Sequence, residues 1–209
     1  MKSFIRTMSA NVQESPNAAP AGLGGVIVVC TANLCRSPMA AALLTRRLSS
    51  LGIHVPVRSA GLLCDGEPAL PEVLPVMAGY GLDLGPHRSR VLTATDLEHT
   101  ALMLGMAREH LRQAVVVHPE AWPRSFTLKE LVRRGEEIGP RLAGERFGEW
   151  LSRAHSGRDR AALLGESAED DVADPTGGPP AGYAATAALL DRLVTRLTEL
   201  CWAHATNRP

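Results

Sequence analysis

The chain has 209 residues with 22 basic and 22 acidic side chains, so its formal charge at neutral pH is zero. This length can bury one hydrophobic core of ordinary size. No basic run indicates a nucleic-acid surface, and no apolar stretch approaches the length of a membrane span. We therefore expect one globular domain without a nucleic-acid or membrane partner, and the sequence leaves its oligomeric state open.

The N-terminal stretch and the cysteines bear on processing and compartment. Residues 1–23 include a polar, proline-bearing segment and no apolar segment of signal-peptide length, which predicts a disordered leader before a domain at 24–209. The four cysteines do not form paired C-x-x-C units and the histidines are scattered. We therefore expect no metal site, no cofactor and a cytoplasmic location.

Strand and helix patterns alternate from residue 26 onward. The predicted elements are a strand at 26–29, a helix from about 36 to 50, a strand at 53–59, a helix at 67–80, a short helix capped by Thr93 or Thr95, a strand at 100–106, a helix at 108–112 and a strand at 114–117. This repeat predicts an α/β fold with a doubly wound parallel sheet.

The segment that follows, residues 119–168, is more charged and helical in pattern. Thr127 with Glu130 three residues later is typical of a helix cap, and 145–164 carries apolar residues at helical spacing. We interpret 119–168 as a helical insertion packed beside the sheet. An alanine- and leucine-rich helix at 183–202 is expected to close the domain.

The first strand leads into a loop with the properties of an anion site. The apolar run 26–29 ends at Cys30, and Pro38 suits the first turn of a helix that begins near Arg36. Backbone N–H groups of such a loop and the helix dipole attract anions, and a guanidinium offers two parallel donors to phosphate-like oxygens. The same field stabilises a thiolate at Cys30, which indicates a nucleophile for phosphoryl transfer. The alternative is a buried core thiol before an ordinary turn.

The motif C-T-A-N-L-C-R-S-P at residues 30–38 resembles the phosphate loop of the low-molecular-weight protein-tyrosine phosphatases, whose relatives include arsenate reductases. The resemblance implies a flavodoxin-like three-layer α/β/α domain with a four-stranded parallel sheet. It also implies that Cys30 is the nucleophile, that Arg36 binds the oxyanion, and that the reaction passes through a cysteinyl-phosphate. The remaining loop positions that it marks are Thr31, Ala32, Asn33, Leu34, Cys35 and Ser37.

Some loop residues have implied roles of their own. By the resemblance, Ser37 hydrogen-bonds the Cys30 sulfur, Asn33 holds the loop backbone, and Cys35 can form a reversible disulfide with the nucleophile. Ala32 stands where the family usually has glycine, so a positive φ at this position would add strain of about 1 kcal/mol. Ser59 and His87 resemble the polar residues that support Asn33 and Ser37 from beneath.

Phosphoryl transfer to sulfur also needs a proton donor for the leaving group. Asp174-Pro175, before the last predicted helix, resembles the family's Asp-Pro pair, whose Asp is the general acid. We expect Asp174 on a mobile surface segment, and Asp170 and Asp171 in solvent. The alternative is a turn residue, since Asp-Pro is common in turns.

The aromatic cleft walls of the phosphotyrosine-selective pattern are missing from this sequence. Residues 62–66 and 176–178 carry no aromatic side chain, although Trp122 and Phe126 could supply one. We expect a cysteine-dependent phosphomonoester hydrolase, protein-tyrosine-phosphatase-like, acting on a phosphorylated protein or a small phosphomonoester. The alternatives are a thiol-dependent arsenate reductase, in which Cys64 would have to reach the site, and a non-catalytic phosphate-binding module.

Overall fold

The computed structural model describes residues 24–202 and contains one parallel sheet. Its strand order is β2-β1-β3-β4, that of a doubly wound sheet. The strands are β1 (Val26–Val29), β2 (Val57–Ala60), β3 (Leu102–Gly105) and β4 (Ser125–Thr127). All of the pairings are parallel, so the expected four-stranded α/β fold is confirmed.

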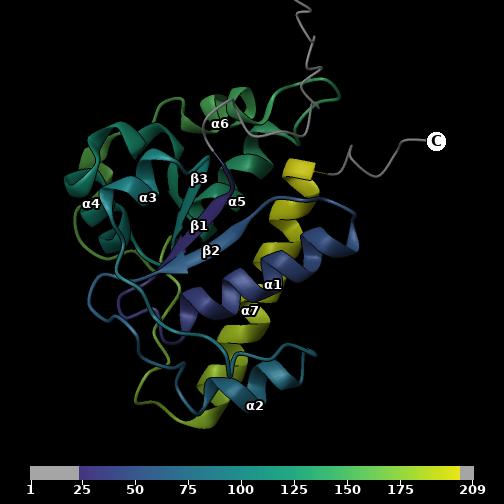
Figure 1. The fold of residues 1–209 in the computed structure, drawn as a ribbon. Helices are drawn as coiled ribbons and strands as arrows, with labels where there is room; N and C mark the ends of the chain where they lie inside the picture. The colour runs from purple at the N-terminus through teal and green to yellow at the C-terminus, as the bar shows by residue number, and fades with distance from the viewer. Residues whose placement is uncertain (1–23, 203–209) are drawn as a thin grey trace, which may run out of the picture.

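Helices cover both faces of this sheet (Figure 1). The α-helices are α1 (Arg36–Ser50), α2 (Val73–Ala78), α3 (Ala94–Glu98), α4 (Arg108–Val117), α5 (Leu128–Ile138), α6 (Phe147–His155) and α7 (Pro180–Trp202). Two 3-10 helices are also present: η1 (Pro119–Arg124) lies between α4 and β4, and η2 (Arg160–Leu163) lies between α6 and α7.

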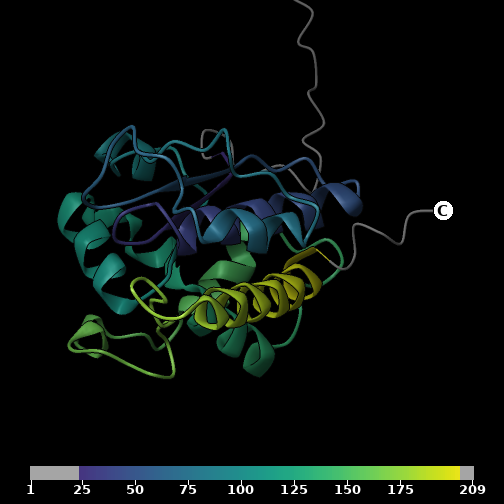
Figure 2. The same ribbon diagram turned by 90° about the horizontal axis from the view of Figure 1, so that it is seen from below.

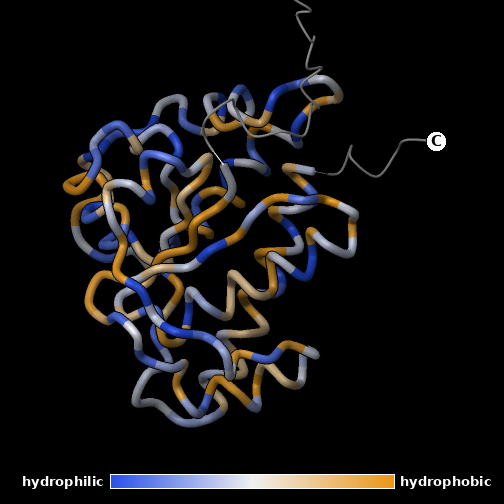
Figure 3. The backbone as a smooth tube through the Cα atoms, in the orientation of Figure 1, coloured by the Kyte–Doolittle hydropathy of each residue, from blue (hydrophilic) through white to orange (hydrophobic). Residues whose placement is uncertain are grey.

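The alternation of β1 side chains divides the core into two layers. Val26 and Val28 face the cluster formed with α1, α5 and α7, while Ile27 and Val29 face the cluster formed with α3, α4 and η1. The view from below in Figure 2 shows α7 lying alongside α1, and Figure 3 shows hydrophobic colour along the central strands. A strand buried on both faces requires a continuous apolar run, which is what residues 26–29 provide.

Strand register brings three chain segments to one edge of the sheet. Val29 at the end of β1 pairs with Ala60 of β2 and Gly105 of β3, so the residues after each strand emerge together. In parallel sheets this carboxyl edge is where ligands bind. The loop that begins at Cys30 lies at this edge.

One predicted strand is wrong. Residues 114–117 form the end of helix α4, in which Leu111 and Ala114 are buried, whereas Val116 is exposed. A run of β-branched residues favours strand locally, but the inward-facing residues repeat at helical spacing. The fourth strand is β4, only three residues long, and sits inside 119–168.

Two predicted helices are shorter than expected. The helix predicted at 67–80 is α2, which begins at Val73 after Pro68 and Pro71. The helix predicted at 145–164 is α6, which ends before Gly157, a residue with φ of 73°. The caps at Thr93 and Thr127 are confirmed, each as a reciprocal capping box.

The domain boundaries remain predictions. The expected leader, 1–23, lies outside the described residues. The range 119–168 holds β4 as well as helices, so its first part belongs to the central sheet. Within residues 24–202, no helix has both the length and the apolar character needed to cross a membrane.

Candidate active site

The loop from Cys30 to α1 exposes a set of backbone N–H groups. Cys30 N donates to Ala60 O (3.3 Å), which ends the β1 ladder. Among the described residues, no acceptor pairs with the amide of any residue from 31 to 37. Helix α1 begins at Arg36, as expected, so its first amides and its dipole point to the same place. A concave set of free amides at a helix start binds anions.

Asn33 gives this loop its shape. Its φ of 58° is the only positive value at a non-glycine position in the described chain, so Ala32 does not carry the strain considered above. The Asn33 side-chain Oδ1 accepts from Arg90 N (3.1 Å), and its carbonyl accepts from His87 Nε2 (2.7 Å). These contacts stabilise a left-handed backbone that an asparagine tolerates better than most residues.

A short hydrogen-bond chain ends at the Cys30 sulfur. Asn33 Nδ2 donates to Ser37 Oγ (2.8 Å), and Ser37 Oγ lies 3.1 Å from Cys30 Sγ. Because Asn33 occupies an acceptor position of the hydroxyl, the single Ser37 proton is left for one of two neighbours, the Cys30 sulfur or the Ala60 carbonyl oxygen at 3.3 Å. A hydroxyl proton directed at the sulfur donates a hydrogen bond that stabilises negative charge on it.

The contact expected from Ser59 is absent. Within residues 24–202, the Ser59 side chain makes no hydrogen bond to the loop; the neighbouring Ala60 carbonyl instead accepts from Ser37 Oγ (3.3 Å) and from Cys30 N. In a parallel sheet the backbone of the adjacent strand is already in place for this contact. His87 does lie beneath the loop, where it contacts the backbone of Asn33 instead of a side chain.

Arg36 and Asp174 meet although 138 positions separate them. Arg36 Nη2 forms an ion pair with Asp174 Oδ2, and Arg36 Nη1 donates to Val172 O (3.1 Å). Arg36 is buried, whereas the Asp174 side chain is 44% exposed. The other Asp174 oxygen, Oδ1, accepts from Thr176 N (3.1 Å) and Thr176 Oγ1 (2.7 Å). The carboxylate is thus oriented with one oxygen toward the loop.

A buried histidine lies beside the residue that follows Cys30. His110 Nδ1 accepts from Ala107 N (2.8 Å), so the proton of the neutral ring is on Nε2, which lies 3.2 Å from Thr31 Oγ1. Thr31 Oγ1 donates to Glu109 Oε1 (3.1 Å) and accepts from Arg36 Nη2 (3.2 Å). Burial and the nearby positive charge of Arg36 lower the pKa of His110 to about 3. The ring is therefore a neutral hydrogen-bond donor and not a proton carrier at physiological pH.

Cys35 differs from Cys30 in its electrostatic setting. Burial, with the negative charges of Asp174 and Cys30, raises the pKa of Cys35 to about 12. Both cysteines are free thiols in the structure. Cys35 therefore remains protonated near neutral pH, and the expected redox role of this residue stays a prediction.

A cavity of about 310 Å³ opens beside Thr31 and Arg36. Its wall includes four acidic residues and a second arginine, and no aromatic side chain: Glu109, Arg112, Glu166, Asp171 and Asp174. Trp122 and Phe126 are not among the residues that line it; their rings instead contact the Arg158 guanidinium at 3.9 and 4.0 Å. In the described chain, no group of three or more acidic, cysteine or histidine residues is placed to hold a metal ion.

Comparison with known proteins agrees with this geometry. The sequence model for low molecular weight phosphotyrosine protein phosphatases matches residues 25–138, which include the loop and all four strands. The chain belongs to this phosphatase family. It is therefore a hydrolase that acts through a cysteine, and the flavodoxin-like fold implied by the resemblance is that of its structural neighbours.

Individual relatives extend the match beyond residue 138. The chain is 38% identical over 107 residues to a probable low molecular weight protein-tyrosine-phosphatase, EpsP, of Ralstonia solanacearum, covering 51% of this chain and 71% of that one. It is 32% identical over 175 residues to a protein-arginine-phosphatase of Geobacillus stearothermophilus, covering 83% and 93%. The crystal structure of a low molecular weight protein tyrosine phosphatase from T. tengcongensis superposes with a TM-score of 0.64 at 32% identity, covering 84% and 98%.

Several residues at the candidate site were not predicted from sequence. Thr176 follows Asp174 by two positions, a spacing typical of side-chain-to-backbone turns, so this contact had a local signal. His110 and Glu109 had none, because their contact with Thr31 crosses from α4 to the loop after β1. Asp170 was expected in solvent, which is wrong: it is 5% exposed.

Proposed function

We propose that this phosphatase removes phosphate from phosphorylated protein side chains, with Cys30 as nucleophile, Arg36 as oxyanion ligand and Asp174 as general acid. The observation that carries the proposal is the convergence of open amides, a hydroxyl-bonded thiol and an Arg36–Asp174 pair at one sheet edge. The open amides of 31–37 and the Arg36 guanidinium are suited to the charge that develops on the transferring phosphoryl group.

The first step forms a bond from Cys30 sulfur to phosphorus as the bond from phosphorus to the leaving atom breaks. Asp174, in its protonated form, gives its proton to that leaving atom. Ser37 holds the sulfur at 3.1 Å and stabilises it as a thiolate whenever it carries negative charge. A substrate phosphate takes over the Arg36 donors, so the Arg36–Asp174 pair separates and Asp174 Oδ2 faces the leaving group.

The second step regenerates the enzyme. The Asp174 carboxylate accepts a proton from water, whose oxygen attacks the phosphorus of the cysteinyl-phosphate. The bond from sulfur to phosphorus breaks, and inorganic phosphate and the Cys30 thiolate are released. The same carboxylate thus serves both steps from one position.

The cavity favours phosphoarginine as a second candidate substrate beside phosphotyrosine. A phenyl ring gains stability by stacking on aromatic faces, and the residues that line the cavity supply none. Glu109, Glu166 and Asp174 instead offer carboxylates, which complement a guanidinium leaving group. The arginine phosphatase relative also matches this chain over more of its length than the Ralstonia relative does.

The experiment compares release of inorganic phosphate from two peptides of one sequence, carrying phosphotyrosine or phosphoarginine. The protein phosphatase assignment requires turnover of at least one of them and loss of that turnover in Cys30→Ser. Higher kcat/KM on phosphoarginine, reduced selectively by Glu109→Gln together with Glu166→Gln, would support the second substrate. Equal effects of this double variant on both peptides would argue against phosphoarginine as a substrate recognised by these carboxylates.

The rival functions are less favoured. Arsenate reduction requires a second thiol that attacks readily, but Cys64 is not among the residues that line the cavity, and burial raises the pKa of Cys35. A non-catalytic phosphate-binding module would need neither the thiol chain at Cys30 nor the carboxylate at Arg36. Arsenite formation that is lost in Cys64→Ser would favour the reductase.

A further inference from the structure

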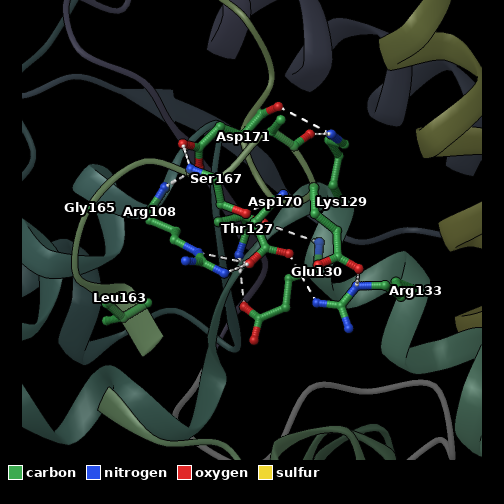
Figure 4. Close-up of polar contacts among 12 residues, drawn as sticks. Arg108, Thr127, Lys129, Glu130, Arg133, Leu163, Gly165, Ser167, Asp170 and Asp171 are labelled. Carbon is green, nitrogen blue, oxygen red and sulfur yellow. Dashed lines mark hydrogen bonds and ion pairs between the residues drawn. The ribbon is translucent and has the colours of Figure 1, made fainter. Parts of the chain in front are cut away.

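The segment that carries Asp174 is fastened to the body of the domain by a buried carboxylate. Asp170 lies between two guanidinium groups (Figure 4). Its Oδ2 accepts from Arg108 Nε (2.9 Å) and Nη2 (2.7 Å), and its Oδ1 accepts from Arg133 Nη2 (3.0 Å). Arg108 belongs to α4 and Arg133 to α5, so Asp170 joins two helices to the segment before the proposed acid.

The next two residues continue this attachment through the backbone. Asp171 Oδ1 accepts from Arg108 N (2.8 Å) at the start of α4, and its Oδ2 accepts from Ser167 N (2.8 Å). Val172 N donates to Met106 O (2.7 Å), just beyond β3. Only Ala173 separates Val172 from Asp174. An unattached chain could displace Asp174 by several ångströms, since each extended residue spans about 3.5 Å.

The Asp170 carboxylate is buried, charged and held in a fixed position by its partners. Its side chain is 7% exposed, and a buried carboxylate is costly unless its partners are well placed. Burial raises its pKa, but the hydrogen bonds from Arg108 and Arg133 outweigh this and leave the pKa below its ordinary value. The carboxylate is therefore charged in the working range of pH, and its contacts are with side chains alone.

We propose that Asp170 is the positioning residue for Asp174: its bridge from Arg108 to Arg133 holds the acid over the phosphate loop. The inference rests on the proposed function, because it assumes that Asp174 donates the proton. Asp170 does not touch the substrate. Its effect on turnover passes through the place of the Asp174 carboxylate, so it should matter most where proton donation limits the reaction.

The test uses a series of aryl phosphates, from good to poor leaving groups, with Asp170→Asn, Asp174→Asn and the double variant. Asp170→Asn keeps the shape of the side chain and removes its charge. We expect kcat to fall about 10- to 100-fold for the poorest leaving group, as small misplacements of catalytic groups do, and much less for the best one. The inhibition constant of inorganic phosphate should change little, because the loop amides and Arg36 remain.

The double variant separates positioning from simple damage. If Asp170 acts only through Asp174, adding Asp170→Asn to Asp174→Asn should cost little further turnover. A full additional loss, or an equal loss for all leaving groups, would overturn the inference. Failure of Asp174→Asn itself to show leaving-group dependence would instead overturn the proposed function.

Neighbouring residues supply the controls. Glu169 also pairs with Arg133 (3.1 Å), but it is 64% exposed and should hold nothing in place, so Glu169→Gln is expected to keep the wild-type profile. If Asp170→Asn does not fold, Arg133→Gln removes one arm of the bridge and leaves Arg108. Arg133→Gln should show the same leaving-group dependence of kcat with a smaller loss. A wild-type profile would contradict the positioning role of the Asp170 bridge.

Discussion

The phosphate loop and the acid segment reach the same site by different physical routes. From Cys30 to Ser37 the contacts join residues close in sequence, such as Asn33 with Ser37 and Ser37 with Cys30. From Asp170 to Asp174 the partners are Arg108, Arg133 and Arg36, each far away in the chain. Local contacts therefore build the hydrogen-bond chain to Cys30, with support for the Asn33 backbone from the distant Arg90 and His87, whereas distant arginines anchor both ends of the second region.

That difference explains what sequence could and could not predict at the site. A strand, a loop and a proline-started helix follow one another at 26–38, so their order alone predicts an anion site. Asp174 could be proposed only through the family resemblance, and the burial of Asp170 had no local signal. An acidic run normally indicates solvent exposure, and only two arginines on separate helices reverse that expectation here.

The substitution expected to have the largest effect on the phosphate loop is the one that removes the Cys30 sulfur. Cys30→Ser should reduce turnover of an aryl phosphate by more than about a thousandfold, because a hydroxyl is far less nucleophilic than a thiolate at neutral pH. The measurement is phosphate release at saturating substrate. Cys64→Ser, a change at a half-buried thiol in the loop after β2, serves as the matched control and should retain turnover. Residual activity above a few per cent in Cys30→Ser would mean that another group attacks phosphorus.

The corresponding substitution in the segment from Asp170 to Asp174 is Asp174→Asn. It keeps the size of the side chain and the acceptor for Thr176 but removes the proton donor. We expect kcat to fall about 100-fold or more for a poor leaving group, and far less for a good one that needs no proton. Asp191→Asn, at an exposed carboxylate paired with Arg46, is the control. Losses of the same size across the leaving-group series would contradict the acid role.

The fold shows the same division on a larger scale. Long periodic segments such as α1 and α7 lie where their patterns predict, because helix spacing and burial agree over many residues. The error at 114–117 arose where local preference and packing disagree: a valine run favours a strand, but Leu111 and Ala114 anchor a helix. The three-residue β4 was missed because so short a strand is specified by pairing with β3 and not by its own composition.

A smaller perturbation tests how closely the loop fits the strand below it. A Cβ on Gly61 would lie 2.7 Å from Asn33 N and 2.8 Å from Ala32 C, both backbone atoms that cannot rotate away. Gly61→Ala should lower the free energy of unfolding by about 1–3 kcal/mol, the usual cost of overpacking. Since the shift falls on the loop amides, kcat/KM should drop about tenfold.

The control for this change is Gly24→Ala. A Cβ there would meet nothing within 4 Å, and no left-handed backbone is involved. Denaturant unfolding and initial rates on an aryl phosphate measure both effects. Normal stability and activity in Gly61→Ala would show that the phosphate loop can shift without loss of stability or activity. The fit of the loop against Gly61 would then not be required for its function.

The smallest effect concerns His110, which joins helix α4 to the phosphate loop by contacting Thr31. Its pKa of about 3 in the folded protein lies below the ordinary value of 6.5, so between these pH values only the unfolded chain takes up this proton. The contribution of the neutral ring to stability is thus complete above pH 6.5 and declines as pH falls. From pH 7 to pH 5 the loss should be about 2 kcal/mol of the free energy of unfolding.

His110→Gln keeps a neutral donor and should remove this part of the pH dependence, measured by urea unfolding at both pH values. Ala114→Gly destabilises the same helix without a titratable group and should retain the wild-type dependence. If His110→Gln also retained it, the ring would be protonated in the folded state, and Thr31 could not be accepting its hydrogen bond from a neutral imidazole.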